Sequence, residues 1–145
     1  MTTSESSGPE VQDLVTGIMT VGIPVSDQDR ALEFYVGVLG MQKALEAPTP
    51  DGGRWLVVAP RAGGTTVALV AAGDGLPKGV ETGIRFATRN AERTRESLAA
   101  SGAEVGDILR WPGVPAMFSF RDPDGNGLEA VEPAASDPAE IRGGA

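Results

Sequence analysis

The sequence predicts an α+β fold in which one β-α-β-β-β unit occurs twice. An alternating strand, a capped amphipathic helix and three short strands follow one another in the same order in each half of the 145 residues. The 20 glycines and 11 prolines fit many short elements that are joined by turns. Two such units are expected to form a curved antiparallel sheet, with the helices on its outer face and a cavity on its inner face.

The first unit begins with a strand over residues 15–25, in which side chains alternate between an apolar face and an opposite face. Ser26 is expected to cap the following helix, since its hydroxyl can accept a bond from the amide of Asp29 while the Asp29 carboxylate reaches back. The helix is expected to run to about Leu39 with one apolar face, made of Ala31, Phe34, Tyr35 and Val38. Three short strands are then expected at 42–46, 54–59 and 65–71.

The second unit repeats this order after a Gly-rich connector. Its helix is expected to be capped by Asn90 and ended by Gly102. A tight turn, Asp-Pro-Asp-Gly-Asn at 122–126, joins the last two strands, because proline presets φ and glycine allows a positive φ. The strands of this unit are expected at 83–87, 104–109, 116–121 and 128–131. The expected organisation is a disordered tail at 1–13, module one at 14–72, a connector at 73–82, module two at 83–132 and a second tail at 133–145.

The composition excludes several kinds of chemistry. There is no cysteine, so a disulfide scaffold, a thiolate metal site and a cysteine nucleophile are absent. There is also no histidine, which is the commonest metal ligand and the usual general base near neutral pH. The net charge of −8 argues against nucleic-acid binding and mildly favours neutral or cationic ligands. The alternative is that the acidity serves solubility alone.

The sequence contains no apolar run of the roughly 18 residues that a membrane helix needs. Its first residues have neither a basic nor an apolar region, so they do not look like a signal peptide. We therefore expect a cytoplasmic protein with no membrane contact.

Two segments resemble a known superfamily. Residues 21–42, VGIPVSDQDRALEFYVGVLGMQ, are similar to the opening of vicinal oxygen chelate proteins, and residues 118–132, FSFRDPDGNGLEAVE, are similar to their closing strand, turn and strand. The resemblance covers about residues 14–132 and implies the glyoxalase/bleomycin-resistance fold. That superfamily includes glyoxalases, extradiol dioxygenases, epimerases, fosfomycin-modifying thiol transferases and antibiotic-binding resistance proteins, so the fold alone does not assign a reaction.

The resemblance also implies where a metal would be held. Enzymes of this superfamily usually bind a divalent ion at four cavity-facing positions, which fall here on Thr20, Ala68, Gly83 and Glu129. Three of these residues coordinate a metal poorly or not at all, and Glu129 alone cannot hold Zn²⁺, Fe²⁺ or Mn²⁺ tightly, because such sites need about three protein ligands. The sequence therefore predicts no metal and no cofactor.

Glu129 is the leading candidate for a functional residue. A partly desolvated carboxylate could bind a cationic or hydrogen-donating ligand, or act as an acid–base group. The alternative is a structural ion pair with Arg85, which lies two residues after Gly83 on the same face. Arg85 could instead bind an anionic ligand.

Other candidate ligand-binding residues come from the strands and loops of both units. Trp111, in the loop sequence RWPGVP, offers a stacking surface for a planar ligand, or else it fixes that loop to the body or to a second subunit. Trp55 fits a core or interface position better than a binding position. Met117 and Ser119 share a strand face that could line the cavity, as does Thr20 on the first strand.

These features predict a metal-independent protein that binds a small molecule, for instance by sequestering an antibiotic or another natural product. One alternative is an enzyme of the same superfamily, of the lyase or isomerase type, with an atypical metal site or with Glu129 as its acid–base group. Another is an accessory subunit that docks through its tails or outer surface. We expect a homodimer, since two-unit members of the fold often share strands or sites between chains.

Overall fold

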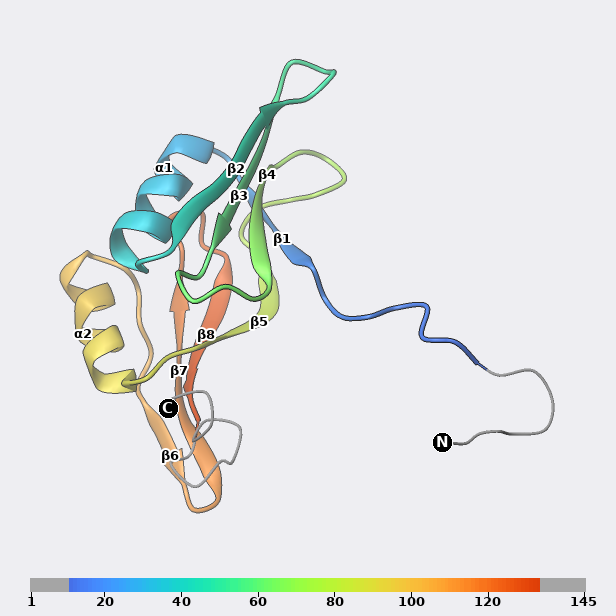
Figure 1. The fold of residues 1–145 in the computed structure, drawn as a ribbon. Helices are drawn as coiled ribbons and strands as arrows, with labels where there is room; N and C mark the ends of the chain where they lie inside the picture. The colour runs from blue at the N-terminus through green and yellow to red at the C-terminus, as the bar shows by residue number, and fades with distance from the viewer. Residues whose placement is uncertain (1–10, 134–145) are drawn as a thin grey trace.

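The structure is a computed structural model that describes residues 11–133 (Figure 1). The two predicted tails fall almost entirely outside the described residues. Module one contains β1 (Thr20–Val25), α1 (Gln28–Leu32), the π-helix η1 (Glu33–Val38), β2 (Gln42–Pro48), β3 (Arg54–Ala59) and β4 (Thr66–Ala71). Module two contains β5 (Glu81–Ala87), α2 (Ala91–Ala100), β6 (Leu109–Trp111), β7 (Val114–Arg121) and β8 (Gly127–Glu132). Within residues 11–133, no helix is long and apolar enough to cross a membrane.

Each module forms a four-stranded sheet, and the predicted duplication is confirmed. The strand orders are β1-β4-β3-β2 and β5-β8-β7-β6. The sheets are mixed rather than antiparallel throughout, because β1 runs parallel to β4 and β5 runs parallel to β8. Neither of these pairs is joined by a hairpin, so nothing in the connections forces them to be antiparallel.

The first helix begins one residue later than predicted. Asp27, not Ser26, is the N-cap, and its carboxylate accepts a bond from the amide of Arg30 (3.0 Å). The Ser26 hydroxyl instead donates to Asp124 in module two (2.5 Å). The second half of the helix widens into η1. It still buries Phe34 and Tyr35 of the predicted apolar face. The predicted cap of the second helix, Asn90, is confirmed, with its side chain accepting from the amide of Arg93 (3.0 Å).

Most predicted strands differ from the observed ones by one or two residues at an end, and two differ by more. The first begins at Thr20 rather than at residue 15, because β4 offers no pairing partner before Thr66. Residues 11–19 extend away from the body (Figure 1) and leave several apolar side chains exposed. The predicted strand at 104–109 is also wrong: Val105 makes one isolated bridge, and β6 lies later in the chain. Trp111 consequently belongs to an edge strand and not to a loop.

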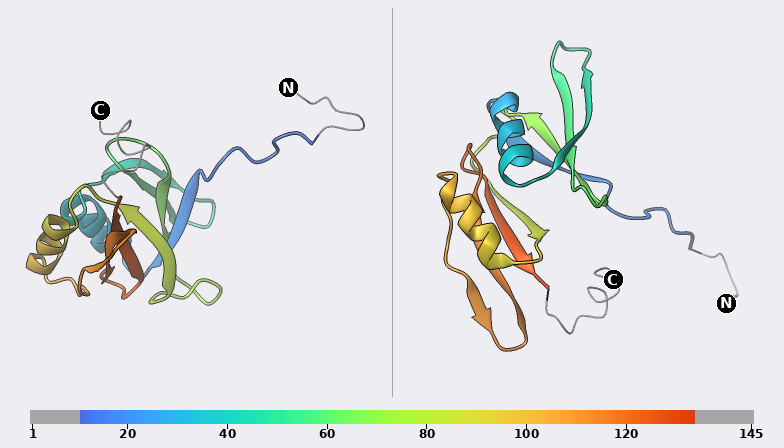
Figure 2. Two further views of the ribbon diagram at one scale, coloured as in Figure 1. Left: turned by 90° about the horizontal axis from the view of Figure 1, so that it is seen from below. Right: turned by 60° about the vertical axis from the view of Figure 1, so that its left-hand side comes forward.

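One hydrophobic core joins the two modules. The core lies between the sheets and the helices. Both helices lie on the same side of the molecule, and the β2–β3 and β6–β7 hairpins extend to opposite ends (Figure 2). Phe34 of η1 packs on Phe120 of β7 with ring centroids 6.4 Å apart. Beside them, the Tyr35 hydroxyl donates to Asp122 (2.8 Å). Burial, together with the Asp122 carboxylate, raises the pKa of Tyr35, so this hydroxyl keeps its proton and remains a donor.

Asn126 fixes the contact between the modules. Its side chain is fully buried, and its amide nitrogen donates to the carbonyl of Pro24 in β1 (2.7 Å). Its amide oxygen accepts from the backbone of Gly79 (2.8 Å) and Val80 (3.1 Å), just before β5. Thr65 holds the equivalent place in module one, directly before β4, and its hydroxyl donates to the carbonyl of Ile18 (2.9 Å).

Replacing Asn126 with alanine is expected to lower the free energy of unfolding by about 3–5 kcal/mol, since it leaves several buried polar groups unpaired. Thr65→Ala is the matched control, because Thr65 is exposed, and we expect a change of about 1 kcal/mol or less. Chemical denaturation of both variants measures the difference. Equal destabilisation by the two substitutions would contradict the role assigned to Asn126.

Candidate functional site

The candidate site consists of the two inner faces, defined here as the sheet faces that point away from the helices and the core. In module one, Gly22 pairs with Ala68 and Ala68 pairs with Val57. Directly opposite residues share a face and side chains alternate along a strand, so Thr20, Ala68 and Trp55 all lie on this inner face. Thr20 is exposed and Trp55 is 40% exposed, so Trp55 is not a core residue.

The inner face of module two carries a polar row across three strands. Arg85 of β5 lies opposite Glu129 of β8, and Glu129 lies opposite Ser119 of β7. The Arg85 Nε donates to Glu129 Oε1 at 2.7 Å, so the predicted ion pair is confirmed. Both side chains are partly exposed, and pairs of this kind contribute little to stability. What the pair can offer a ligand is a charged hydrogen-bond donor beside a charged acceptor.

A second ion pair lies beside the first, and the sequence analysis missed it. Arg121 of β7 donates to Glu81 of β5 at 2.6 Å, and this bond raises the pKa of Arg121. The two residues face each other across Gly127 of β8. The prediction began the strand at Gly83 and so left Glu81 in the connector. Gly83 itself lies in a stretch where the register shifts, with φ at +74°.

The remaining candidates lie near the edge of module two. Met117 shares the inner face with Ser119 and is paired with Leu109 of β6. Trp111 ends β6 opposite Val114 and is 56% exposed. The structure therefore gathers Thr20 and Trp55 on one inner face and Arg85, Met117, Ser119 and Glu129 on the other, while Trp111 lies exposed at the edge of module two, beyond a register shift. It does not bring the two sets together within one chain.

The residues present do not fit a divalent metal. Thr20, Ala68 and Gly83 supply at most one neutral hydroxyl between them, and the carboxylate of Glu129 is bonded to Arg85. Within residues 11–133 no three Asp, Glu, His or Cys side chains are grouped so that they could hold an ion. A tight site needs about three protein ligands of the right type. No chemical step is therefore assigned to a metal.

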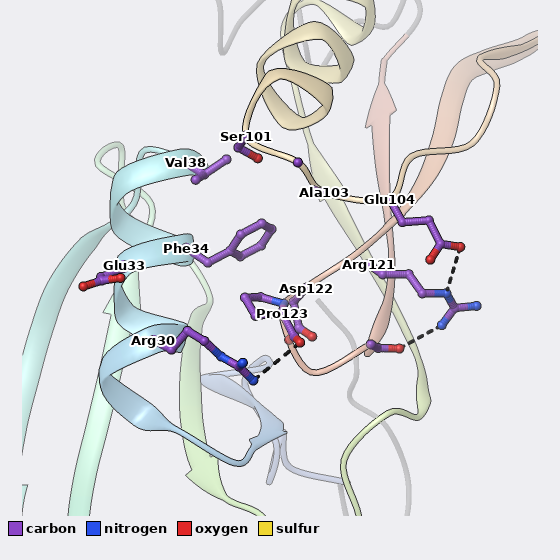
Figure 3. A pocket seen from close by; sticks show the side chains of 12 residues that line it. Arg30, Glu33, Phe34, Val38, Ser101, Ala103, Glu104, Arg121, Asp122 and Pro123 are labelled. Carbon is purple, nitrogen blue, oxygen red and sulfur yellow. Dashed lines mark hydrogen bonds and ion pairs between the residues drawn. The ribbon is translucent and has the colours of Figure 1, made fainter.

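A hollow of about 530 Å³ lies between the modules on the helix side (Figure 3). Arg30 and Phe34 line it from module one, and Glu104 and Arg121 line it from module two. Next to it, the buried Asp124 accepts from the Ser26 hydroxyl and lies 3.4 Å from the Arg30 guanidinium. This contact connects the modules, and none of the predicted site residues lines the hollow.

The superfamily follows from comparison with known proteins. The model of the Glyoxalase/Bleomycin resistance protein/Dioxygenase superfamily matches residues 17–130. The chain therefore belongs to this superfamily, as its opening and closing segments indicate. The two β-α-β-β-β modules with open, curved sheets are the fold of that superfamily.

Three relatives illustrate the range of similarity. A superfamily member of known structure from Sphaerobacter thermophilus DSM 20745 is 31% identical, with a TM-score of 0.76, and the match covers 83% of this chain and 99% of that one. TnmS3 from Streptomyces sp. CB03234, described as an antibiotic binding protein, is 29% identical, with a TM-score of 0.74 and coverage of 83% and 98%. The uncharacterized protein YetH of Bacillus subtilis (strain 168) is 29% identical over 119 residues, which cover 78% of this chain and 95% of YetH.

The donor set leads to a prediction about metals. Protein purified without a histidine tag is expected to contain no stoichiometric divalent metal, and its melting temperature should not change with chelator or with added Zn²⁺ or Mn²⁺. A bound metal at 100 times its Kd would instead add about 2.7 kcal/mol of stability. Elemental analysis and thermal melts measure both quantities. Near-stoichiometric metal whose removal lowers the melting temperature would contradict the prediction.

Proposed function

We propose that this protein binds a small organic molecule, an antibiotic or another natural product, without a metal and without changing it chemically. The observation that carries the proposal is the chemistry of the inner faces. Trp55 is exposed on one inner face, the Arg85–Glu129 pair lies on the other with Trp111 exposed at the nearby edge strand, and neither face carries a set of metal ligands. A site that only binds a small molecule needs apolar and aromatic surface with a few well-placed polar groups. It does not need a reactive centre.

The relatives support a binding role. TnmS3, which is described as an antibiotic binding protein, matches most of this chain at 29% identity. The superfamily also contains enzymes, so membership by itself does not choose between binding and catalysis. The choice rests on the residues at the inner faces.

Each candidate residue has a role in this proposal. Trp111 and Trp55 supply stacking surfaces for a planar ligand. Arg85 and Glu129 supply a donor and an acceptor that orient it. Thr20, Met117 and Ser119 complete the lining. The net charge of −8 favours a cationic or hydrogen-donating ligand over an anionic one. The two inner-face glutamates add acceptors rather than net charge, because each is paired with an arginine.

The proposed site needs two chains. The inner faces are open to solvent, with Arg85 and Ser119 exposed on one and Thr20 exposed on the other. We propose a homodimer in which the inner face of module one of one chain covers that of module two of its partner. Residues 11–19 add support, because Val15 and Met19 are each more than 80% exposed and are apolar enough to favour burial against a second copy.

Light scattering in solution is expected to give twice the chain mass of 14.9 kDa. Replacing Val15 and Met19 with glutamate should shift the equilibrium towards the monomer, because charged side chains resist burial. Replacing Asp13, which lies in the same segment, with asparagine is the control. A monomer for the unmodified chain, at the concentrations used for ligand binding, would refute the dimer.

A thermal-shift screen of cationic and aromatic natural products is expected to identify a ligand. Saturation at 100 times Kd adds about 2.7 kcal/mol. Trp111→Ala should then weaken binding about tenfold, or roughly 1.4 kcal/mol, through the loss of stacking. Trp111→Phe keeps an aromatic ring and should retain most of the affinity. Absence of any shift across a broad panel would count against the proposal.

The enzyme alternative is tested with the same ligand. Its residue is Glu129, whose carboxylate is bonded to Arg85, so a proton-transfer role requires that bond to open. In the binding protein, Glu129→Gln changes the affinity and the ligand is recovered intact from both proteins. Conversion of the ligand by the unmodified chain, abolished in Glu129→Gln, would replace the binding role with a catalytic one.

A further inference from the structure

The two ends of the contact between the modules are closed differently. Figure 3 shows one end, where Asp122 and Pro123 begin the turn at 122–126. Asp124 of the same turn accepts from Ser26 and pairs with Arg30 of module one. At the other end, the equivalent turn between β3 and β4 is Pro-Arg-Ala-Gly-Gly at 60–64, which has no acidic side chain. Its arginine, Arg61, donates to the carbonyl of Gly40 within its own module (3.1 Å). Among residues 11–133, the side chain of Arg61 makes no hydrogen bond or ion pair to module two at this end.

A groove of about 730 Å³ lies at this open end. It is larger than the hollow in Figure 3, and its size is typical of small-molecule sites. Its apolar surface comes from both modules: Leu39, Met41, Phe86, Phe120 and Ala130. Arg61 and Arg89 also line it, and both are exposed.

The charge of the groove is opposite to that of the chain. The sequence has 20 acidic and 12 basic residues, yet no Asp or Glu side chain is among the described residues that line the groove. Within residues 11–133, neither Arg61 nor Arg89 forms an ion pair, whereas Arg30, Arg54, Arg85, Arg95, Arg110 and Arg121 all do. Two guanidinium groups beside an apolar surface form a site that an anion with an apolar body would satisfy.

We propose that this groove is a second ligand site, which binds an aliphatic carboxylate. The carboxylate pairs with Arg61 and Arg89, and the chain of the ligand lies on Leu39, Met41 and Phe86. The site is separate from the proposed natural-product site, because Thr20, Trp55, Arg85, Trp111, Met117, Ser119 and Glu129 are absent from its lining. It also differs in charge, because the inner face of module two balances Arg85 and Arg121 with Glu129 and Glu81, whereas the groove has two arginines and no acidic side chain among its described lining residues.

Decanoate is the probe, with decanol as its uncharged counterpart, both below the concentration at which they form micelles. Isothermal titration of the full chain is expected to show decanoate binding at least tenfold tighter than decanol. Arg61→Gln and Arg89→Gln should each weaken decanoate binding about tenfold and leave decanol unchanged. Lys78→Gln removes the same charge from the exposed connector and should have no effect. Amide NMR shifts should centre on Met41, Gly63 and Thr94, which line the groove.

Three results would overturn the proposal. The first is an affinity for decanoate that is equal in the double variant Arg61→Gln/Arg89→Gln and in the unmodified chain. The second is a set of NMR shifts centred on Trp55 and Trp111, which would assign decanoate to the inner faces. The third is binding only to a chain that ends at Pro133, which would make the C-terminal segment the natural occupant. Trp111→Ala separates the two proposals, since it should weaken natural-product binding and leave decanoate binding unchanged.

Discussion

The arrangement of the two modules depends on the buried hydrogen bonds of Asn126 and its neighbour Asp122. Asn126 donates to Pro24 in β1, and Asp122 accepts from Tyr35 in η1, so both bonds cross from module two to module one. A buried polar group that loses its partner costs about 1–3 kcal/mol, which makes other relative positions of the modules unfavourable. The aromatic contact of Phe34 with Phe120 adds area and attraction, but it does not by itself fix an orientation.

This packing uses the helix sides of both modules, and the inner faces are left as free surface. Each helix packs mainly on its own module, α1 on β4 and α2 on β7 and β8, and the helix sides of the modules meet through contacts such as Phe34 with Phe120. Within residues 11–133, Trp55 and the Arg85–Glu129 pair therefore remain partly exposed. A closed cavity then requires another chain, which is why the proposed function includes a dimer. The same packing leaves a hollow at each end of the contact between the modules. The turn at 122–126 supplies acidic side chains at one end, and the turn at 60–64 supplies Arg61 at the other.

Features set by short stretches of sequence could be predicted, and most features set by distant contacts could not. The duplicated order of elements and the cap at Asn90 follow from local patterns. The pairing of Arg85 with Glu129 joins distant strands and could be predicted because the resemblance places Glu129 and the strand of Arg85 at the cavity. The shift in β5 that brings Glu81 into the sheet depends on pairing with β8, which is far along the chain. The late start of β1 likewise depends on where β4 begins. The groove beside Arg61 and Arg89 is lined by residues of both modules, so no single sequence motif predicts it.

The side chains at the four expected metal positions also favour binding. Thr20, Ala68 and Gly83 are small residues that offer no charged ligand. Glu129 is bonded to Arg85, which leaves the pair with no net charge but with a donor and an acceptor. A site with exposed indole rings and a neutralised ion pair is suited to recognise a whole molecule by stacking and a few polar contacts. Catalysis would require a group free to exchange a proton or to polarise a bond, and at the inner faces both Glu129 and Glu81 are held by arginine.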